Sequence, residues 1–173
     1  IGLPEAQLDM VEPSVIWDNL RRRRLEFEHP SKKKCETLAH VRVLLADDAP
    51  DSLRLYERVL SRAGARVTCA SDGRQAVECF TEGTFDLVLL DVHMPVLDGL
   101  GAARMIRELA PSLPVLALTA SPVEHDHAKS LQAGFNDHLV KPISSLDLIE
   151  ACSWWTRCQR SNEAGVDDRR RAG

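Results

Sequence analysis

The sequence predicts an α/β domain with a doubly wound, five-stranded parallel sheet between two layers of helices. This fold class is predicted first by the order of the elements. From residue 41 onward, five short apolar runs are each followed by a segment with helical periodicity. The second support is the third run, residues 85–91, which is almost continuously apolar. Such strands are typical of parallel sheets that helices cover on both faces. We therefore expect three layers, α/β/α, joined by right-handed crossovers.

Local patterns place the individual elements. The expected strands are short and apolar, and they cover residues 41–46, 66–70, 85–91, 115–119 and 137–140. The expected helices carry apolar residues three and four positions apart, and they cover residues 52–63, 72–83, 99–110, 122–133 and 144–155. Asp72 can cap one helix, and Ser144 or Ser145 can cap the last one. Gly64 and Gly134 follow two helices, at the place where a left-handed residue commonly ends a helix.

The chain divides into three parts, of which residues 41–157 form the predicted domain. Residues 1–40 contain three prolines and two basic runs, and we expect a linker or docking segment with a helix at 14–28. Residues 158–173 are mostly polar, and we expect a disordered tail there. The chain begins with Ile rather than Met, so we expect it to be processed or part of a longer protein.

Composition excludes several classes of protein. Apolar residues make up 44% of the chain and charged residues 28%, as in ordinary globular domains, which excludes collagen-like and wholly disordered chains. The five cysteines are odd in number and lack zinc-knuckle spacing, so a reducing, cytoplasmic setting is favoured over a disulfide scaffold. No run approaches the roughly 18 apolar residues of a membrane span, and we expect no membrane insertion in this chain.

Charge is unevenly distributed along the chain. Residues 41–152 hold ten basic and sixteen acidic side chains, a net charge of −6, whereas the basic runs lie outside this segment. Phosphate backbones are bound by Lys and Arg side chains. An acidic domain therefore argues against nucleic acid as a direct partner.

Candidate ligand-binding residues lie at the ends of four of the five expected strands. They are Asp47 and Asp48 after the first strand, Asp91 at the end of the third, Thr119 and Ala120 at the end of the fourth, and Lys141 after the fifth. In open α/β sheets, ligands bind beyond the carboxyl ends of the strands. We therefore expect these residues to meet at one edge of the sheet.

The chemistry of this set favours metal-assisted phosphoryl transfer. Carboxylates a few ångströms apart repel one another, and a divalent cation relieves that repulsion; an all-oxygen site suits Mg²⁺. Lys141 offers a compact positive charge to a phosphoryl oxygen, while the Thr119 hydroxyl and the Ala120 backbone N–H can donate to other oxygens. The set predicts a magnesium-assisted phosphoryl acceptor in which a carboxylate is the nucleophile.

The segments ADDAP, LLDVHMPVLDG, LALTA and LVKPI, in this order and spacing, resemble the receiver domain of two-component response regulators over residues 41–152. The resemblance implies a flavodoxin-like fold with strand order 2-1-3-4-5. It also implies that Asp91 takes a phosphoryl group from a phosphohistidine. Asp48, Asp91 and the backbone carbonyl of His93 would then bind Mg²⁺ directly, while Asp47 would act mainly through water. By the same resemblance, Lys141 bridges the carboxylate and the phosphoryl group.

The resemblance also implies a switch, in which Thr119 moves toward the phosphoryl group and the Lys141-Pro142 peptide is cis. In the family, an inward-moving Tyr or Phe usually occupies the place that His138 has here. An imidazole can move likewise, but it adds a titratable group. Hybrid sensor kinases often carry this His in a similar context, which favours a hybrid kinase as the parent protein.

The resemblance implies a histidine kinase or a histidine phosphotransfer domain as the partner, with a second copy of the chain, packed through the last helices, as a further option. Self-phosphorylation and dephosphorylation are the only catalysis that it implies for this domain. Three alternatives stay open at this point. The first is a degenerate receiver that acts only in docking, and the second is a phosphatase that uses a strand-end Asp as its nucleophile. The third is a flavin-binding module, which would need a phosphate-binding loop where this chain has the acidic segment DDAPD.

Overall fold

The structure is a computed structural model that describes residues 38–120 and 132–170, with side chains described for 38–120 and 132–159. Its helices and strands, in chain order, are β1 (Arg42–Ala46), α2 (Pro50–Arg62), β2 (Arg66–Ala70), α3 (Gly73–Glu82), β3 (Leu87–Asp91), α4 (Gly99–Leu109), β4 (Val115–Thr119), β5 (Asp137–Val140) and α6 (Ser145–Arg170). The helix expected at 14–28 and most of that expected at 122–133 lie outside the described residues.

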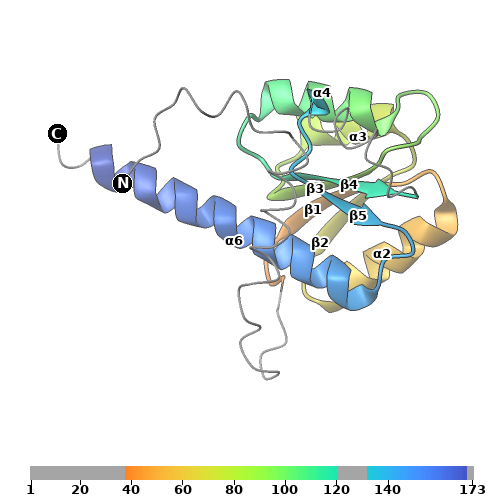
Figure 1. Cartoon of the computed structure of the whole chain (residues 1–173), viewed down its shortest axis with the longest axis horizontal. Helices are drawn as coiled ribbons and strands as arrows, with labels where there is room; N and C mark the ends of the chain where they lie inside the picture. Colours follow the sequence, from red (N-terminus) through yellow and green to blue (C-terminus); the bar gives the residue numbers. More distant parts are fainter. Residues whose placement is uncertain (1–37, 121–131, 171–173) are drawn as a thin grey trace, which may run out of the picture.

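All neighbouring strands are parallel, and the sheet order is β2-β1-β3-β4-β5. This confirms the predicted fold class and strand order. Figure 1 shows the layers: α3 and α4 lie on one face of the sheet, and α2 and α6 lie on the other. The order leaves β2 and β5 at the edges and places β1, β3 and β4 next to one another, which brings their carboxyl ends together.

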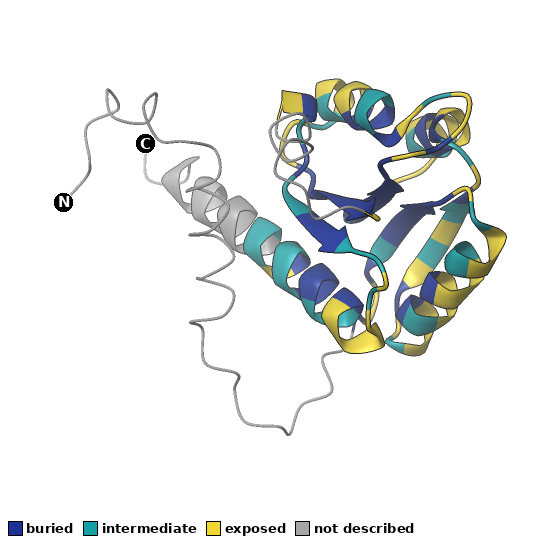
Figure 2. Ribbon diagram, turned by 45° about the vertical axis from the view of Figure 1, so that its right-hand side comes forward, coloured by how far each residue is buried: buried dark blue, intermediate teal, exposed yellow. Residues whose placement is uncertain are grey.

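Two apolar clusters, one on each face, hold the sheet in place. Side chains of β3 alternate between them: Leu87 and Leu89 pack toward α2 and α6, whereas Val88 and Leu90 pack toward α3 and α4. All five residues of β3 and of β4 are buried, and Figure 2 shows the central strands in the colour of buried residues. A fully buried Leu or Val stabilises a fold by about 1.5–3 kcal/mol. The central strands are therefore the firmest support for residues at their ends.

Most helix ends lie within two residues of the expected positions, because the capping residues act as predicted. The Asp72 carboxylate accepts a hydrogen bond from the backbone N–H of Gln75 (2.9 Å) at the start of α3. The Ser144 hydroxyl accepts one from the backbone N–H of Asp147 (3.1 Å) at the start of α6. Helix α2 begins earlier than expected, at Pro50, because the fixed φ of proline suits the first turn of a helix.

Helix α6 is longer than the sequence analysis expects. It continues to Arg170, through most of the segment assigned to a disordered tail, and extends beyond the edge of the sheet in Figure 1. Residues 158–170 contain no proline, and their one glycine, Gly165, costs a helix only about 1 kcal/mol relative to alanine. Helical backbone is thus compatible with this polar sequence. Among the described residues, none of the helices combines the length and apolar composition needed to cross a bilayer.

Arg107, near the end of α4, joins three backbone segments. Its guanidinium donates to the carbonyls of Pro111 (2.6 Å) and Leu113 (2.8 Å) in the connection to β4. It also donates to the carbonyl of Gly134 and to Oδ1 of Asn136 (2.8 Å), just before β5. Burial at this position lowers the pKa of the guanidinium. One side chain therefore fixes the approach to β5 against the approach to β4.

We expect Arg107→Ala to lower the free energy of unfolding by about 2–4 kcal/mol, because several partly buried acceptors lose their donor. Urea unfolding followed by circular dichroism measures the loss. Arg104→Ala is the matched control: Arg104 is exposed on the same helix, and its removal should change the free energy by less than about 0.5 kcal/mol. Equal losses in the two variants would contradict the role assigned to Arg107.

Candidate functional site

The residues expected at the strand ends lie at the carboxyl edge of the sheet. Asp91 is the last residue of β3 and Thr119 the last of β4, while Asp47 directly follows β1 and Lys141 directly follows β5. Because these four strands are adjacent and parallel, their ends face the same side. The buried apolar residues within each strand fix its register. The polar residue at the end of each strand therefore lies at this edge.

The three carboxylates of the site form one cluster. Asp47, Asp48 and Asp91 each offer a carboxylate oxygen, and these oxygens lie within 4.8 Å of one another. Their exposure differs: Asp47 is 0% exposed and Asp91 is 7% exposed, whereas Asp48 is an exposed residue. The cluster thus has two buried members and one that faces solvent.

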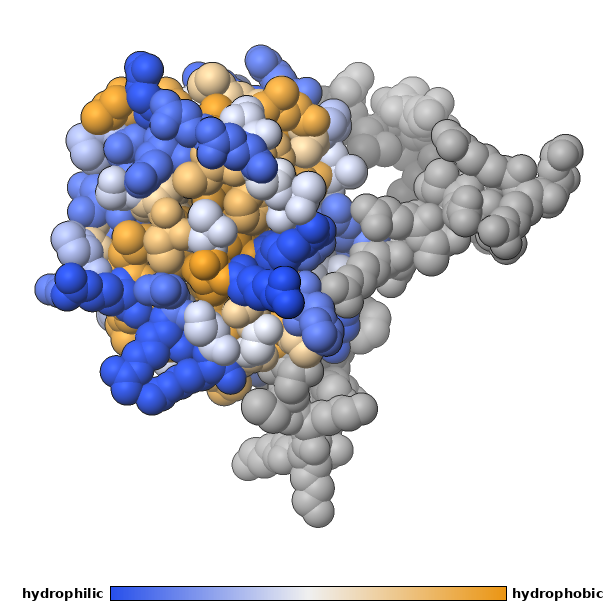
Figure 3. Space-filling model, turned by 180° about the vertical axis from the view of Figure 1, so that it is seen from behind, coloured by the Kyte–Doolittle hydropathy of each residue, from blue (hydrophilic) through white to orange (hydrophobic). Residues whose placement is uncertain are grey.

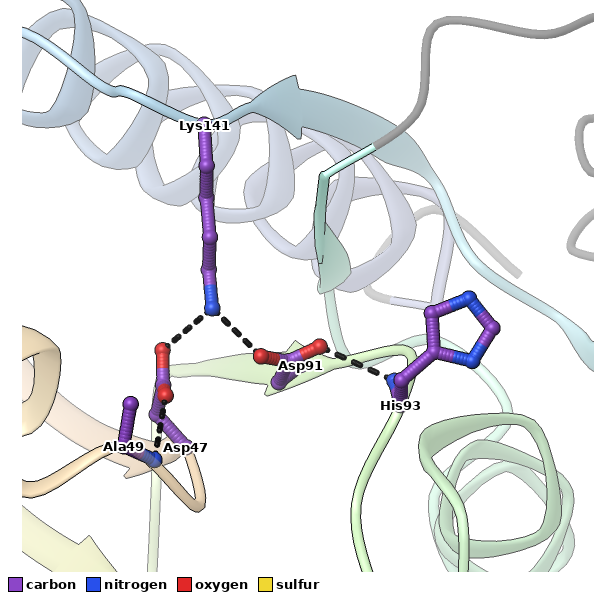
Figure 4. Close-up of polar contacts among 5 residues, drawn as sticks. All are labelled: Asp47, Ala49, Asp91, His93 and Lys141. Carbon is purple, nitrogen blue, oxygen red and sulfur yellow. Dashed lines mark hydrogen bonds and ion pairs between the residues drawn. The ribbon is translucent and has the colours of Figure 1, made fainter.

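Lys141 lies between the two buried carboxylates (Figure 4). Its Nζ donates to Oδ2 of Asp47 at 2.7 Å and forms a second ion pair with Oδ2 of Asp91. Burial alone would lower the pKa of the ammonium, but the hydrogen bonds and charges of Asp47 and Asp91 outweigh it and raise that pKa above its ordinary value. The side chain is therefore an ammonium at neutral pH.

Backbone N–H groups hold the other oxygen of each buried carboxylate. Ala49 N–H donates to Oδ1 of Asp47 (3.0 Å), and His93 N–H donates to Oδ1 of Asp91 (2.9 Å). Figure 4 shows the His93 ring directed away from the carboxylates, and the residue is exposed. Each of the two carboxylates is thus fixed from both sides, by the ammonium and by the loop that follows its own strand.

The loop after β3 is held by a close backbone approach that the sequence analysis did not identify. A Cβ on Gly99 would lie 2.0 Å from the carbonyl oxygen of Asp91, so only glycine fits there. Asp98 caps α4 by accepting a hydrogen bond from the backbone N–H of Gly101 (2.7 Å). The Asp98-Gly99 pair was the only sequence signal for this close approach. Such a pair indicates a turn, but it does not reveal that Gly99 lies against the backbone of Asp91.

The remaining predicted residues lie nearby, with different surroundings. Thr119 is 3% exposed, and its carbonyl accepts from the N–H of Lys141 (2.7 Å). Ala120 follows it and is exposed, at the end of the first described range. His138 is 5% exposed within β5, with its ring 6.1 Å from that of Phe135. Ion pairs thus join the Lys141 side chain to two of the acids, and the Thr119 carbonyl joins the backbone of Lys141.

The charges of the site are suited to a divalent cation. The three carboxylates and the single ammonium leave a net charge of −2, with every candidate ligand an oxygen. Oxygen ligands are those that Mg²⁺ prefers. The residues present therefore fit a magnesium site, with Asp48 as the exposed member of the group.

Comparison with known proteins agrees with this geometry. The family model for the response regulator receiver domain matches residues 43–153. Among curated proteins, the sensor histidine kinase GacS of Pseudomonas protegens is 33% identical over 94% of this chain, and the transcriptional regulatory protein PrrA of Mycobacterium tuberculosis is 39% identical over 62%. This chain covers 19% of the length of GacS and 46% of that of PrrA.

A solved structure gives a further comparison. The receiver domain of the sensor histidine kinase PA1611 from Pseudomonas aeruginosa PAO1 matches 68% of this chain and 98% of its own, with a TM-score of 0.64 and 38% identity. That structure has a magnesium ion coordinated in its active-site cleft. Because the family model spans well over half of the sequence, the chain belongs to the response regulator receiver domain family.

Proposed function

We propose that this chain takes a phosphoryl group from a phosphohistidine onto the carboxylate of Asp91 and passes on a signal through a change of conformation. The observation that carries this proposal is the setting of Asp91. Its carboxylate ends a buried strand, pairs with the Lys141 ammonium, and lies within 4.8 Å of two further carboxylates. Such a group is shielded from bulk water yet lies at the edge where ligands of α/β sheets bind.

In the proposed step, one Asp91 oxygen attacks the phosphorus atom of the phosphoimidazole. A P–O bond forms as the P–N bond breaks, and the electron pair of the broken bond goes to the imidazole nitrogen, which takes a proton from solvent. The hydrogen bond from His93 N–H keeps the carboxylate oriented. Lys141 already forms an ion pair with Asp91, and after the transfer its ammonium can pair with the phosphoryl oxygens.

Asp48, Asp91 and the His93 carbonyl are the proposed direct magnesium ligands, and Asp47 is proposed to act mainly through water. Support comes from the exposure of the two adjacent acids, because Asp47 has no exposed surface whereas Asp48 is exposed to solvent. When bound, Mg²⁺ would offset the charge of the cluster and of the incoming phosphoryl oxygens. We assign the Thr119 hydroxyl and the Ala120 N–H to the remaining phosphoryl oxygens, and Thr119 with His138 to the switch.

The proposed partner is a histidine kinase or a histidine phosphotransfer domain, since receiver domains take phosphoryl groups from histidine kinases. Several large apolar side chains are exposed in the described part of the chain, and three of them lie on α2, in the loop after β3 and on α6. They are Leu55 of α2, Val96 in the loop after β3, and Leu146 of α6, which are 54%, 75% and 65% exposed. Exposed apolar side chains of this size suit contact with another protein.

The parent protein is proposed to be a hybrid sensor kinase. The similarity to GacS extends over 94% of this chain, well beyond the residues that the family model matches. This supports a relationship for the segment preceding the domain as well as for the domain itself. A cytoplasmic location and a second copy packed through the last helices stay predictions from the sequence.

Asp91→Asn should abolish phosphoryl uptake and leave the fold intact, because the amide has the same shape but is a poor nucleophile. The measurement is the intact mass after incubation with acetyl phosphate and Mg²⁺, with circular dichroism to check folding. Asp51→Asn, an exposed acid in the first turn of α2, is the control and should be phosphorylated normally. A phosphorylated mass for Asp91→Asn at the wild-type level would rule out the assignment.

Asp48→Asn should weaken Mg²⁺ binding by roughly tenfold or more, since it removes a charged direct ligand. Asp47→Asn should weaken binding less, because Asp47 is fully buried and is proposed to act on the ion through water. Titration calorimetry with Mg²⁺ on both variants compares the two losses under identical conditions. Equal losses would contradict the proposed division between a direct ligand and one that acts through water.

A further inference from the structure

The connection from the end of β2 to the start of α3 is bonded to both acid-bearing loops of the site, although β2 itself supplies none of the proposed ligands. On one side, the carbonyl of Ala70, the last residue of β2, accepts a hydrogen bond from the N–H of Asp47 (3.2 Å). On the other side, the N–H of Gly73 donates to the carbonyl of Leu97 (3.1 Å), in the loop after β3. The connection therefore lies between the loop that follows β1 and the loop that follows β3.

Gly73 meets the loop after β3 at a distance that only glycine allows. A Cβ at this position would lie 2.2 Å from the carbonyl oxygen of Leu97 and 2.9 Å from its carbonyl carbon. It would also lie 3.2 Å from the carbonyl oxygen of Asp98. All these atoms belong to the backbone, so no side-chain rotation can make room for a Cβ. Any larger residue must therefore push one of the two backbones away.

The loop is itself strained at Val96. The φ of this residue is 68°, and the N–H of Leu97 donates to the carbonyl of Pro95 across it (2.8 Å), which makes a γ-turn of the rare positive-φ kind. A positive φ is unfavourable for a β-branched residue, and burial does not offset this cost because Val96 is 75% exposed. Such a conformation persists only where neighbouring contacts hold it. The hydrogen bond from Gly73 to Leu97 is a contact of this kind, at the end of the turn.

The other end of this short loop carries a proposed metal ligand. His93 donates its N–H to Oδ1 of Asp91 (2.9 Å), and its carbonyl is one of the proposed magnesium ligands. Three residues separate His93 from Leu97. They have little freedom to absorb a shift, because Met94 is 8% exposed in the apolar cluster of α3 and α4 and Pro95 has a fixed φ. A displacement of the Leu97 backbone is therefore passed on to His93.

We propose that Gly73 is a positioning residue for the magnesium site: its close contact with the Leu97 carbonyl holds the loop after β3 in its strained turn and thereby keeps the His93 carbonyl in place as a ligand. The inference rests on the proposed function, because the His93 carbonyl is a ligand only in that proposal. It gives the connection after β2, the strand that supplies none of the ligands, a part in metal binding.

The first test is titration calorimetry with Mg²⁺ on wild type, Gly73→Ala and Gly101→Ala. We expect Gly73→Ala to bind Mg²⁺ about tenfold more weakly, because removing a group that orients a metal ligand typically costs ten- to a hundredfold in affinity. Gly101→Ala is the matched control, because a Cβ there would lie 2.7 Å from Cδ1 of Leu97, the end of a side chain that can turn aside. The Leu97 backbone should then stay in place, and the affinity should change less than about twofold.

A second pair of variants decides the matter if Gly73→Ala does not fold. Val96 is exposed, so its replacement leaves the core intact. Val96→Pro fixes φ at about −65° and prevents the γ-turn, whereas Val96→Gly permits a positive φ. We expect Val96→Pro to bind Mg²⁺ about tenfold more weakly and Val96→Gly to stay within about twofold of wild type. Circular dichroism checks that each variant is folded.

A spectroscopic readout needs no metal. In the amide NMR spectrum of the metal-free protein, we expect the His93 N–H resonance to move in Gly73→Ala, because its hydrogen bond to Asp91 changes with the loop. The same resonance should stay in place in Gly101→Ala. A general loss of stability would leave the resonance of the folded protein unchanged, so an unmoved His93 resonance in Gly73→Ala would contradict the positioning role.

The outcomes separate this inference from the proposed function. A wild-type protein that binds no Mg²⁺ would overturn the proposed magnesium site. A wild type that binds Mg²⁺, with Gly73→Ala equal to it, would overturn only the role of Gly73, and so would an equal loss in Gly101→Ala. Wild-type affinity in Val96→Pro would show that the turn does not hold the His93 carbonyl, which also overturns the positioning role.

Discussion

The ammonium of Lys141, placed between the carboxylates of Asp47 and Asp91, is the interaction on which the rest of the site depends. Asp47 has no exposed surface, and a carboxylate taken out of water without a partner costs several kcal/mol. The carboxylate at the end of β1 therefore needs a cation beside it. That cation is the Lys141 ammonium, which follows β5 at the edge of the sheet. The same ammonium leaves the cluster with a net charge of −2, which a divalent cation can balance. Structural stability and the proposed chemistry thus depend on one charge arrangement.

The sheet makes this arrangement possible, because four of its strands end at the same edge and their apolar residues leave no freedom of register. Helices and loops then adjust the details. Gly99 lets α4 approach the Asp91 carbonyl, and Arg107 fixes the approach to β5. The surface of the domain is less uniform: Figure 3 shows, on the face opposite to that of Figure 1, apolar patches interrupted by strongly hydrophilic side chains. Partners are therefore expected to recognise a mixed surface.

The fold was predictable because apolar runs and capping residues are local signals; β2, β4 and β5 lie where the pattern places them, and Asp72 caps α3 as expected. The site residues were predictable because the strand-end rule converts sequence position into proximity. The contacts of Arg107 were not, because they join segments far apart in sequence and depend on side-chain geometry. The length of α6 was underestimated because a polar sequence without proline is compatible with both helix and disordered tail.

The most direct test of the charge arrangement is a double-mutant cycle of unfolding free energies, measured in urea without metal. Lys141→Met leaves two buried carboxylates without their cation, and we expect a loss of about 2–4 kcal/mol. Adding Asp47→Asn removes one of those charges, so the double variant should be more stable than Lys141→Met alone. If the two losses simply add, the ammonium does not act by compensating the buried carboxylate, and the account given for this site is wrong.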